Sequence, residues 1–338
     1  MFYSYLGPVR FFFYFWPSLI RFGVRFVRAR RTAIRNAIAR LHQIEQELEG
    51  SFDEATFQKV VERHGVHLPL VCDPFSALHA RFTIAAEQER DIYYFICSSL
   101  LDDFFDQKTL TIRQINDIVF EPGMYKSGTF NERAFLFSHV FLLREIKHQQ
   151  AYERVLRDVV QAQSDSLRQF DPHITEEEIQ RITFSKGGNS LLLCRYYLDS
   201  EACEAEEQCW YRLGTMIQLC NDLADIYKDR QDAIQTLATR CTDAEAIADF
   251  FNEQVDGFRA QVALLPYPRK QKMDFSLAMA AIYSLGLVAI DNLRKLQVGA
   301  ASLPPPEQVP REALILDMEK PANILRWVRY VHRHSWRG

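Results

Sequence analysis

Two acidic stretches of this chain, DDFFD at residues 102–106 and QLCNDLADIYKD at residues 218–229, predict helices that bind metal ions. Residues four apart on an α-helix differ by about 40° in direction and lie about 6 Å apart along the axis. Oxygen-bearing side chains with that spacing therefore form a stack on one helix face. The first stretch places Asp102 and Asp106 in such a stack, and the second places Asn221, Asp225 and Asp229.

Stacked carboxylates favour a divalent cation, because like charges at helical spacing repel one another. Carboxylate and amide oxygens suit hard ions, and Mg²⁺ usually completes its coordination with water and substrate phosphates. The sequence therefore predicts Mg²⁺ and a diphosphate ester. Both stretches end strongly apolar segments, where carboxylates need partners, so we favour this interpretation over a merely solvated acidic face.

With these residues the chain resembles the class I isoprenoid synthases over roughly residues 80 to 300. DDFFD matches their DDxxD motif, and the second stretch matches their N-x-x-x-(S/T/D)-x-x-x-(E/D) motif. Asp at the middle position, with Gln218 and Leu219 just before, is most similar to squalene and phytoene synthases and to bacterial class IB terpene synthases. The resemblance implies an all-α bundle around a central apolar pocket and three Mg²⁺ ions. It implies catalytic or metal-binding roles for Asp102, Asp103, Asp106, Asn221, Asp225 and Asp229.

The hydrophobic pattern independently predicts an all-α fold. Glycine is scarce, and periodic segments are long. We expect three parts: an N-terminal segment at 1–40, a bundle at 41–300, and a basic helix at 311–338 after the proline-rich linker 303–310. Capping-box spacing predicts helix starts at Ser51, Thr175 and Thr242. The expected helices cover residues 32–49, 83–106, 131–169, 175–199, 205–229, 243–264 and 272–297.

Residues between and after the two motifs are candidate substrate ligands. Two adjacent glycines in an apolar helical stretch predict a kink, and the resemblance implies a broken helix there that lines the pocket. A basic side chain near that break would contact diphosphate, and three are open candidates. A C-terminal Arg-Tyr pair resembles the pair that closes over diphosphate in terpene cyclases, although a basic surface helix explains it equally well. The candidates are Gly187, Gly188, Lys186, Arg181, Arg195, Arg329 and Tyr330.

Small side chains one turn before Asp102 bear on substrate length. Cys97, Ser98 and Ser99 leave room at a position where bulky residues would close the pocket floor, so we expect a chain of about C20 or longer. Aromatic residues beside the motif, Phe95 among them, are candidates to stabilise a carbocation by their quadrupole, although such residues are more often simple core.

The N-terminal segment is basic and aromatic. Residues 1–40 contain eight arginines and no acid, and the apolar run from Phe11 to Ile20 is too short to span a bilayer and is broken by Pro17. Residues 1–31 therefore predict either peripheral membrane contact or a lid packed over the bundle. The formal net charge of −4 argues against a nucleic-acid partner. Seven cysteines without a C-x-x-C pair indicate a reducing compartment, so we expect a cytoplasmic protein, membrane-associated if residues 1–31 bind lipid.

These features favour one function over three others. The first is a terpene synthase, a lyase that cyclises one prenyl diphosphate. The second is a prenyltransferase performing head-to-head condensation, as squalene and phytoene synthases do. Chain elongation is third, because a basic glycine-rich segment for a second diphosphate is missing. A non-catalytic isoprenoid-lipid binder is the fourth, and the intact acids speak against it. The sequence leaves product skeleton and oligomeric state open.

Overall fold

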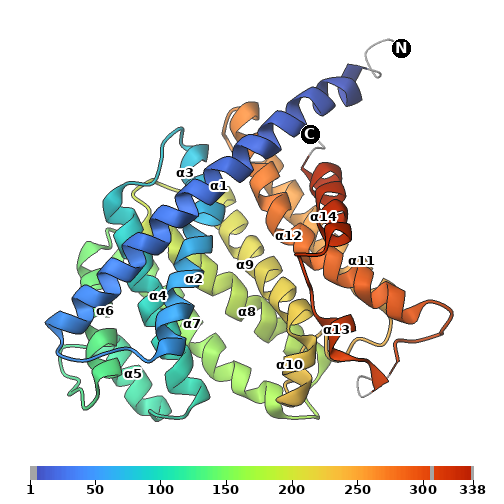
Figure 1. Ribbon diagram of the computed structural model, residues 1–338. Helices are drawn as coiled ribbons and strands as arrows, with labels where there is room; N and C mark the ends of the chain where they lie inside the picture. Colours follow the sequence, from blue (N-terminus) through green and yellow to red (C-terminus); the bar gives the residue numbers. More distant parts are fainter. Residues whose placement is uncertain (1–5, 305–307, 336–338) are drawn as a thin grey trace. The chain divides into compact units, whose positions relative to one another are not determined.

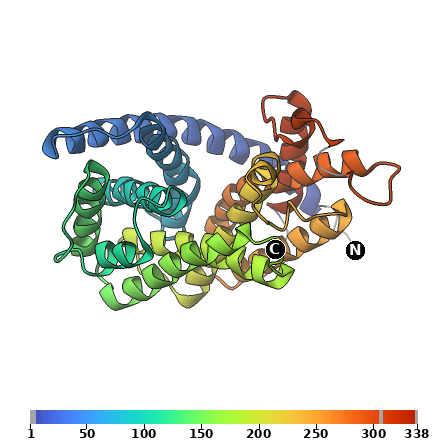
Figure 2. The ribbon, with the colours of Figure 1, turned by 90° about the horizontal axis from the view of Figure 1, so that it is seen from below.

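Every regular element of the structure is a helix. The computed structural model describes residues 6–304 and 308–335, with side chains from residue 14 onward. Within those residues it contains α-, 3₁₀- and π-helices and no strand (Figures 1 and 2). The predicted all-α fold is therefore confirmed. A bundle around a central apolar pocket stays a prediction.

The helices group into two compact units. The first unit comprises residues 18–154 and 196–200, and the second comprises 1–17, 155–195 and 201–338. Helix α1 (Leu6–Glu47), α7 (Gln149–Ser166) and the short η3 (Arg195–Tyr197) cross the boundary in sequence. Because α1 runs without a break, the boundary that we predicted near residue 40 falls inside it. The predicted linker at 303–310 lies partly outside the described residues.

The first unit is organised around α4 (Ala85–Asp106), which packs against α2 and α6. The contact side of α4 is apolar: Phe104 is buried and lies 5.8 Å from Phe135 of α6 between ring centroids. Burying such rings stabilises this unit. Its other elements are α2 (Glu54–His67), the π-helical turn η1 (Leu68–Cys72), α3 (Asp73–Leu78), α5 (Ile112–Phe120) and α6 (Phe130–Glu145).

The second unit is organised around α9 (Glu204–Ala224), which packs against α8, α11 and α12. Trp210 of α9 and Phe251 of α11 are fully buried there. The remaining elements are η2 (Leu167–Phe170), α8 (Glu176–Cys194), α10 (Ile226–Gln231), α11 (Ala244–Ala263), α12 (Arg269–Gln297), α13 (Arg311–Leu314) and α14 (Pro321–His334).

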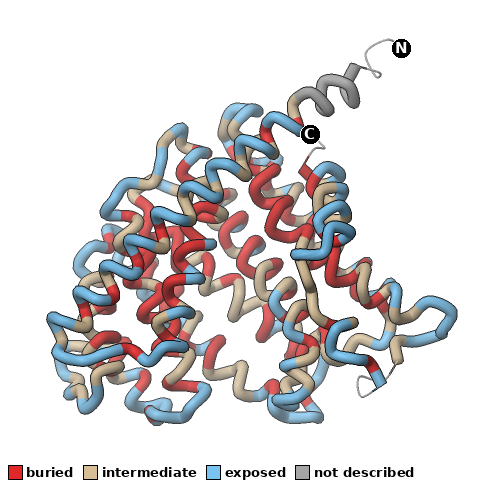
Figure 3. The backbone as a smooth tube through the Cα atoms, viewed as in Figure 1, coloured by how far each residue is buried: buried red, intermediate tan, exposed pale blue. Residues whose placement is uncertain are grey.

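Helix α12 is long and apolar enough to cross a membrane, yet it is a core helix. It is the one such helix among the described residues, and 78% of its most apolar stretch is buried inside the protein. Figure 3 shows most of α12 coloured as buried. A helix that packs all round against other helices reads as continuously hydrophobic for that reason.

Helix boundaries confirm part of the sequence pattern. Thr175 caps α8 and forms the predicted capping box with Glu178. At α2 the prediction is wrong, because Asp53 and not Ser51 caps the helix, accepting the Thr56 N–H at 2.8 Å. At α11 it is wrong by one residue, since Asp243 takes the capping position. An aspartate side chain caps as well as serine or threonine does.

The most consequential difference lies at the glycine pair of α8. We expected Gly187 and Gly188 to break the helix, but α8 is continuous from Glu176 to Cys194. A Cβ atom on Gly187 would come within 3.0 Å of the Gly214 carbonyl oxygen on α9, and one on Gly188 would meet the Tyr211 ring. Gly187 therefore lets the two helices touch backbone to backbone, and Gly188 makes room for the Tyr211 ring; both contacts require a residue without Cβ.

Candidate active site

The first acidic motif occupies the C-terminal end of α4. The helix extends through Asp106, so Asp102 and Asp106 share a face as their spacing predicted. Asp102 and Asp103 are half-buried, whereas Asp106 is exposed.

Basic side chains of α2 neutralise this motif. Lys59 Nζ lies 3.4 Å from Asp102 Oδ2 and 3.3 Å from Asp103 Oδ1. Arg63 Nη1 lies 3.1 Å from Asp102 Oδ2. The Thr56 hydroxyl donates to Asp103 Oδ2 at 3.1 Å. The charges of Asp102 and Asp103 are therefore offset by basic side chains of α2, and metal binding by this motif stays a prediction.

The sequence did not lead us to predict these α2 residues as part of the site, although their regular spacing is visible in it. Thr56, Lys59 and Arg63 follow one another at intervals of three and four, so they share one face of α2. Because α2 packs against α4, that face meets the motif. Carboxylates that can hold a cation and basic groups that can hold a phosphate are thus neighbours.

The second motif spans a break between two helices. Helix α9 ends at Ala224 and α10 begins at Ile226, so Asp225 lies between them. The Asp225 N–H donates to the Asn221 carbonyl at 2.8 Å, and the Asp229 N–H donates to the Asp225 carbonyl at 2.8 Å. Helix-like spacing therefore continues through the break. Asn221 and Asp225 are exposed, and Asp229 is half-buried.

A buried acid of the same stretch, Asp222, escaped the sequence analysis. Gln218, four residues earlier, donates to Asp222 Oδ1 at 2.8 Å, and Thr183 of α8 donates to Oδ2 at 3.4 Å. Only 6% of Asp222 is exposed. Burial raises its pKa to about 6, while hydrogen bonds and the charge of Lys186 act in the opposite direction. The four-residue spacing from Gln218 was the available signal.

Asp229 is a half-buried acid whose pKa is also raised by neighbouring carboxylates. Burial raises its pKa to about 7, and the negative charges of Asp222 and Asp225 add to that effect. These carboxylates therefore repel one another, and a bound hard cation would reduce that repulsion. Asn221 and Asp225 of the same stretch are exposed to solvent. By the chemistry of their donors, the residues of this motif fit Mg²⁺.

The candidate basic residues of α8 differ in their surroundings. Lys186 is close enough to Asp222 to lower its pKa, so α8 does bring a lysine to the second motif. Arg181 instead pairs with Asp165 at 2.7 Å. Arg195, at the end of α8, lies 3.5 Å from Glu207. Of the three alternatives, Lys186 is the one whose charge acts on an acid of the second stretch, the buried Asp222.

The two members of the C-terminal Arg-Tyr pair lie in different surroundings. The Tyr330 hydroxyl donates to Asp291 of α12 at 2.8 Å, and burial with this hydrogen bond raises the Tyr330 pKa to about 12. Arg329 is exposed. The Tyr330 side chain therefore links α14 to α12 by a hydrogen bond.

The candidate floor residues point in different directions. Ser98 lies four residues before Asp102, so it shares the motif face, and its hydroxyl donates to the Phe95 carbonyl at 3.4 Å. Cys97 is buried and donates to the Phe135 carbonyl of α6. Ser99 is fully buried. Adjacent helical residues are about 100° apart, so the three side chains do not share one face of α4. Phe95 is itself buried, with its ring edge-on to His67.

Comparison with models of known protein families and with curated proteins finds no match to this chain.

Proposed function

We propose that this protein is a Mg²⁺-dependent class I terpene synthase that ionises a prenyl diphosphate of about C20 or longer and cyclises the carbocation. One observation carries the proposal: basic side chains of α2 lie beside the first acidic motif, and the charge of a lysine of α8 acts on a buried acid within the second acidic stretch. Lys59 and Arg63 accompany Asp102 and Asp103, and Lys186 accompanies Asp222. A site for a metal diphosphate needs both carboxylates for the cations and donors for the phosphate oxygens.

The proposed roles follow from these positions. In the first motif Asp102 and Asp106 would hold Mg²⁺, and in the second Asn221, Asp225 and Asp229 would do so; when bound, Mg²⁺ neutralises the charge of a leaving diphosphate. A cation bound by these carboxylates would free Lys59 and Arg63 from their ion pairs, and both side chains would then be available to donate to phosphate oxygens. Lys186 would donate in the same way from α8. Asp222 orients Gln218 and Thr183 and keeps the α8 face fixed against α9.

Product analysis tests this proposal. The purified chain is incubated with Mg²⁺ and prenyl diphosphates of C10, C15, C20 and C25, each supplied alone, and the products are identified by mass and by ring count. We expect a cyclic hydrocarbon or alcohol with the carbon number of the substrate. A product of doubled carbon number would establish head-to-head condensation instead. Binding without consumption of any substrate would favour a lipid-binding role.

The Ser98→Phe substitution should shift preference to shorter substrates. A phenyl ring added on the face of Asp102, one turn deeper along α4, would occupy space otherwise available to the chain. We expect the ratio of C20 to C15 turnover to fall about tenfold or more, since a lost fit of 1.4 kcal/mol has that effect. Ala86→Phe, on an exposed position of the same helix, is the matched control. An unchanged ratio would show that other residues set chain length.

We also propose that α1 contacts an anionic membrane surface. Trp16, Ile20, Val24 and Val27 are large apolar residues exposed on one face of this helix, although water-facing positions are normally polar. Exposed arginines flank them at positions 21, 25 and 28. An apolar stripe bordered by arginine is the pattern of an interfacial helix.

Liposome co-sedimentation measures this contact. We expect binding to anionic vesicles that weakens as salt increases, and a loss of most bound protein in Ile20→Asp. Thr32→Asp is the control, because it adds the same charge at an exposed position of α1 without removing an apolar side chain. Equal binding by Ile20→Asp and Thr32→Asp would contradict insertion of the apolar residues into the membrane. If the wild type did not bind at all, α1 would have no role in membrane contact and would instead pack within the protein.

A further inference from the structure

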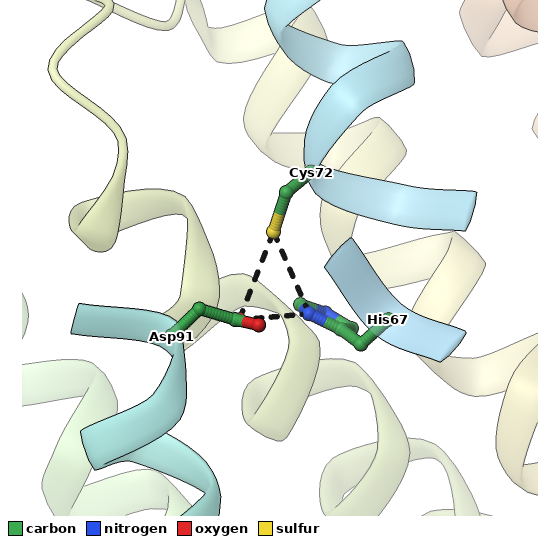
Figure 4. A group of neighbouring side chains, drawn as sticks. All are labelled: His67, Cys72 and Asp91. Atoms are coloured by element: carbon green, nitrogen blue, oxygen red, sulfur yellow. Dashed lines mark hydrogen bonds and ion pairs between the residues drawn. The ribbon is translucent and has the colours of Figure 1, made fainter. Parts of the chain in front are cut away.

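Three side chains that the proposed function does not use converge inside the first unit. His67 ends α2, Cys72 ends the π-helical turn η1, and Asp91 lies in α4. Figure 4 shows the three side chains pointing toward one another. Their ligand atoms lie within 4.8 Å of one another, the one such group of three among the described residues.

The separations are short and the site is closed. His67 Nδ1 lies 2.9 Å from Asp91 Oδ1 and 3.5 Å from Cys72 Sγ, and the sulfur lies 3.7 Å from the same carboxylate oxygen. Cys72 and Asp91 are each only 1% exposed, and His67 is 9% exposed. Polar groups buried this deeply need partners, and here each finds them in the other two.

This geometry differs from that of a Cys-His-Asp catalytic triad. In a triad the histidine uses one ring nitrogen for the nucleophile and the other for the carboxylate. Here Cys72 and Asp91 both approach Nδ1, whereas Nε2 of His67 is buried without a hydrogen-bond partner in the described structure. The three atoms surround a common point, as ligands of a cation do.

A π-helical turn makes the convergence possible. His67 and Cys72 are five residues apart, which on a regular α-helix would place them about 140° apart. The Asp73 N–H donates to the Leu68 carbonyl, five residues back, so the turn is wider than an α-helical one. Pro69 lies at its start and lacks an N–H, which removes one regular α-helical hydrogen bond. The wider turn carries Cys72 round to the side of His67.

A second histidine fixes the carboxylate. His64 Nδ1 lies 2.8 Å from Asp91 Oδ2, the oxygen that does not face Cys72, and His64 is fully buried. The carboxylate is therefore oriented with Oδ1 toward Cys72 and His67. Hydrogen bonds from outer residues that orient a ligand in this way are typical of metal sites.

The three separations match a zinc ion in size. Atoms this far apart all lie about 2.0 Å from the centre of the circle through them, so an ion slightly above that centre would be about 2.0 to 2.3 Å from each, the range of Zn–N, Zn–O and Zn–S bonds. One soft thiolate, one imidazole and one carboxylate suit zinc better than they suit Mg²⁺. We propose that His67, Cys72 and Asp91 bind one Zn²⁺ ion, with His64 orienting Asp91 and one small ligand completing the tetrahedron.

Zinc at this point would tie η1 and the end of α2 to α4. Asp91 lies on the helix that ends in the first acidic motif, and α2 carries Lys59 and Arg63, so the ion would hold these two helices in register. On binding, the Cys72 thiol releases its proton to solvent and the His67 imidazole takes the Nε2–H form. This proposal does not depend on the proposed catalytic function.

Cobalt substitution tests the site. The full-length protein, stripped with chelator, is titrated with Co²⁺ and then with Zn²⁺ while the absorption spectrum is recorded. We expect one equivalent of Co²⁺ to give a thiolate charge-transfer band and intense tetrahedral d–d bands, and Zn²⁺ to abolish both by displacement. Zn²⁺ should also raise the melting temperature, because it binds only the folded chain.

Variants assign the ligands. Cys72→Ser should remove the charge-transfer band, and His67→Gln and Asp91→Asn should remove or weaken it. Cys97→Ser, another buried thiol, is the control and should keep the full spectrum. Absence of the band in the wild-type protein would overturn the proposal and leave a hydrogen-bonded network, and that result needs no variant to fold. Survival of the band in Cys72→Ser, or of a band at full intensity in His67→Gln, would overturn it as well.

Discussion

Replacing Asp225 by alanine should lower prenyl diphosphate turnover by about 10²- to 10³-fold, and Asp102→Ala, Asp106→Ala and Asn221→Ala should have effects of the same order. Each variant removes one oxygen ligand from the proposed Mg²⁺ sites, so less of the charge on the leaving diphosphate is neutralised. Turnover is measured at saturating Mg²⁺ by product formation.

Two comparisons make this result specific. Helix content measured by circular dichroism should stay unchanged in the four variants, because none of these side chains is buried. Asp249→Ala, which removes an exposed carboxylate from α11, should keep wild-type turnover. Undiminished activity in the double variant Asp102→Ala/Asp225→Ala would contradict the metal sites altogether.

The second large effect concerns stability. Gly214→Ala and Gly187→Ala should each lower the free energy of unfolding by about 1 to 3 kcal/mol, the usual cost of overpacking. A Cβ atom at either position would come within 3.0 Å of backbone atoms of the opposite helix, so α8 and α9 would have to separate. Urea denaturation gives the difference in free energy.

A third glycine serves as the control for this experiment. Gly23 lies within α1, and a Cβ atom there would meet nothing within 4 Å. Gly23→Ala should therefore be neutral or stabilising by up to about 1 kcal/mol, because alanine favours the helix. If all three alanine variants behaved alike, the close contact between α8 and α9 would not be a real constraint.

Local pattern sufficed for the first motif and failed at the glycines. The sequence pattern places Asp102 to Asp106 at the end of a periodic apolar segment, and in the structure α4 ends at Asp106. Gly187 and Gly188 looked like a helix break because glycine lowers helix propensity. At Gly187 the deciding factor is the backbone of Gly214, 27 positions further along (214 minus 187), and no local rule reports such a contact.

The missed residues share the same cause. Lys59 and Arg63 acquire meaning only because α2 packs on α4, and Asp222 only because Thr183 of α8 lies against α9. Cys72 and His67 meet through a π-helical turn whose wider spacing differs from the one that sequence patterns assume. The spacing of residues along an α-helix identifies those that share one face of that helix. It does not identify groups whose members come from two packed helices or from a π-helical turn.

Release of diphosphate from geranylgeranyl diphosphate tests the central claim most directly, since ionisation must precede every later step. The purified protein is assayed with Mg²⁺ and with Mg²⁺ plus excess chelator. We predict release that equals formation of a C20 product when Mg²⁺ is present, and loss of release when it is chelated. Release that continues in excess chelator, or no release under either condition with any prenyl diphosphate, would contradict the account.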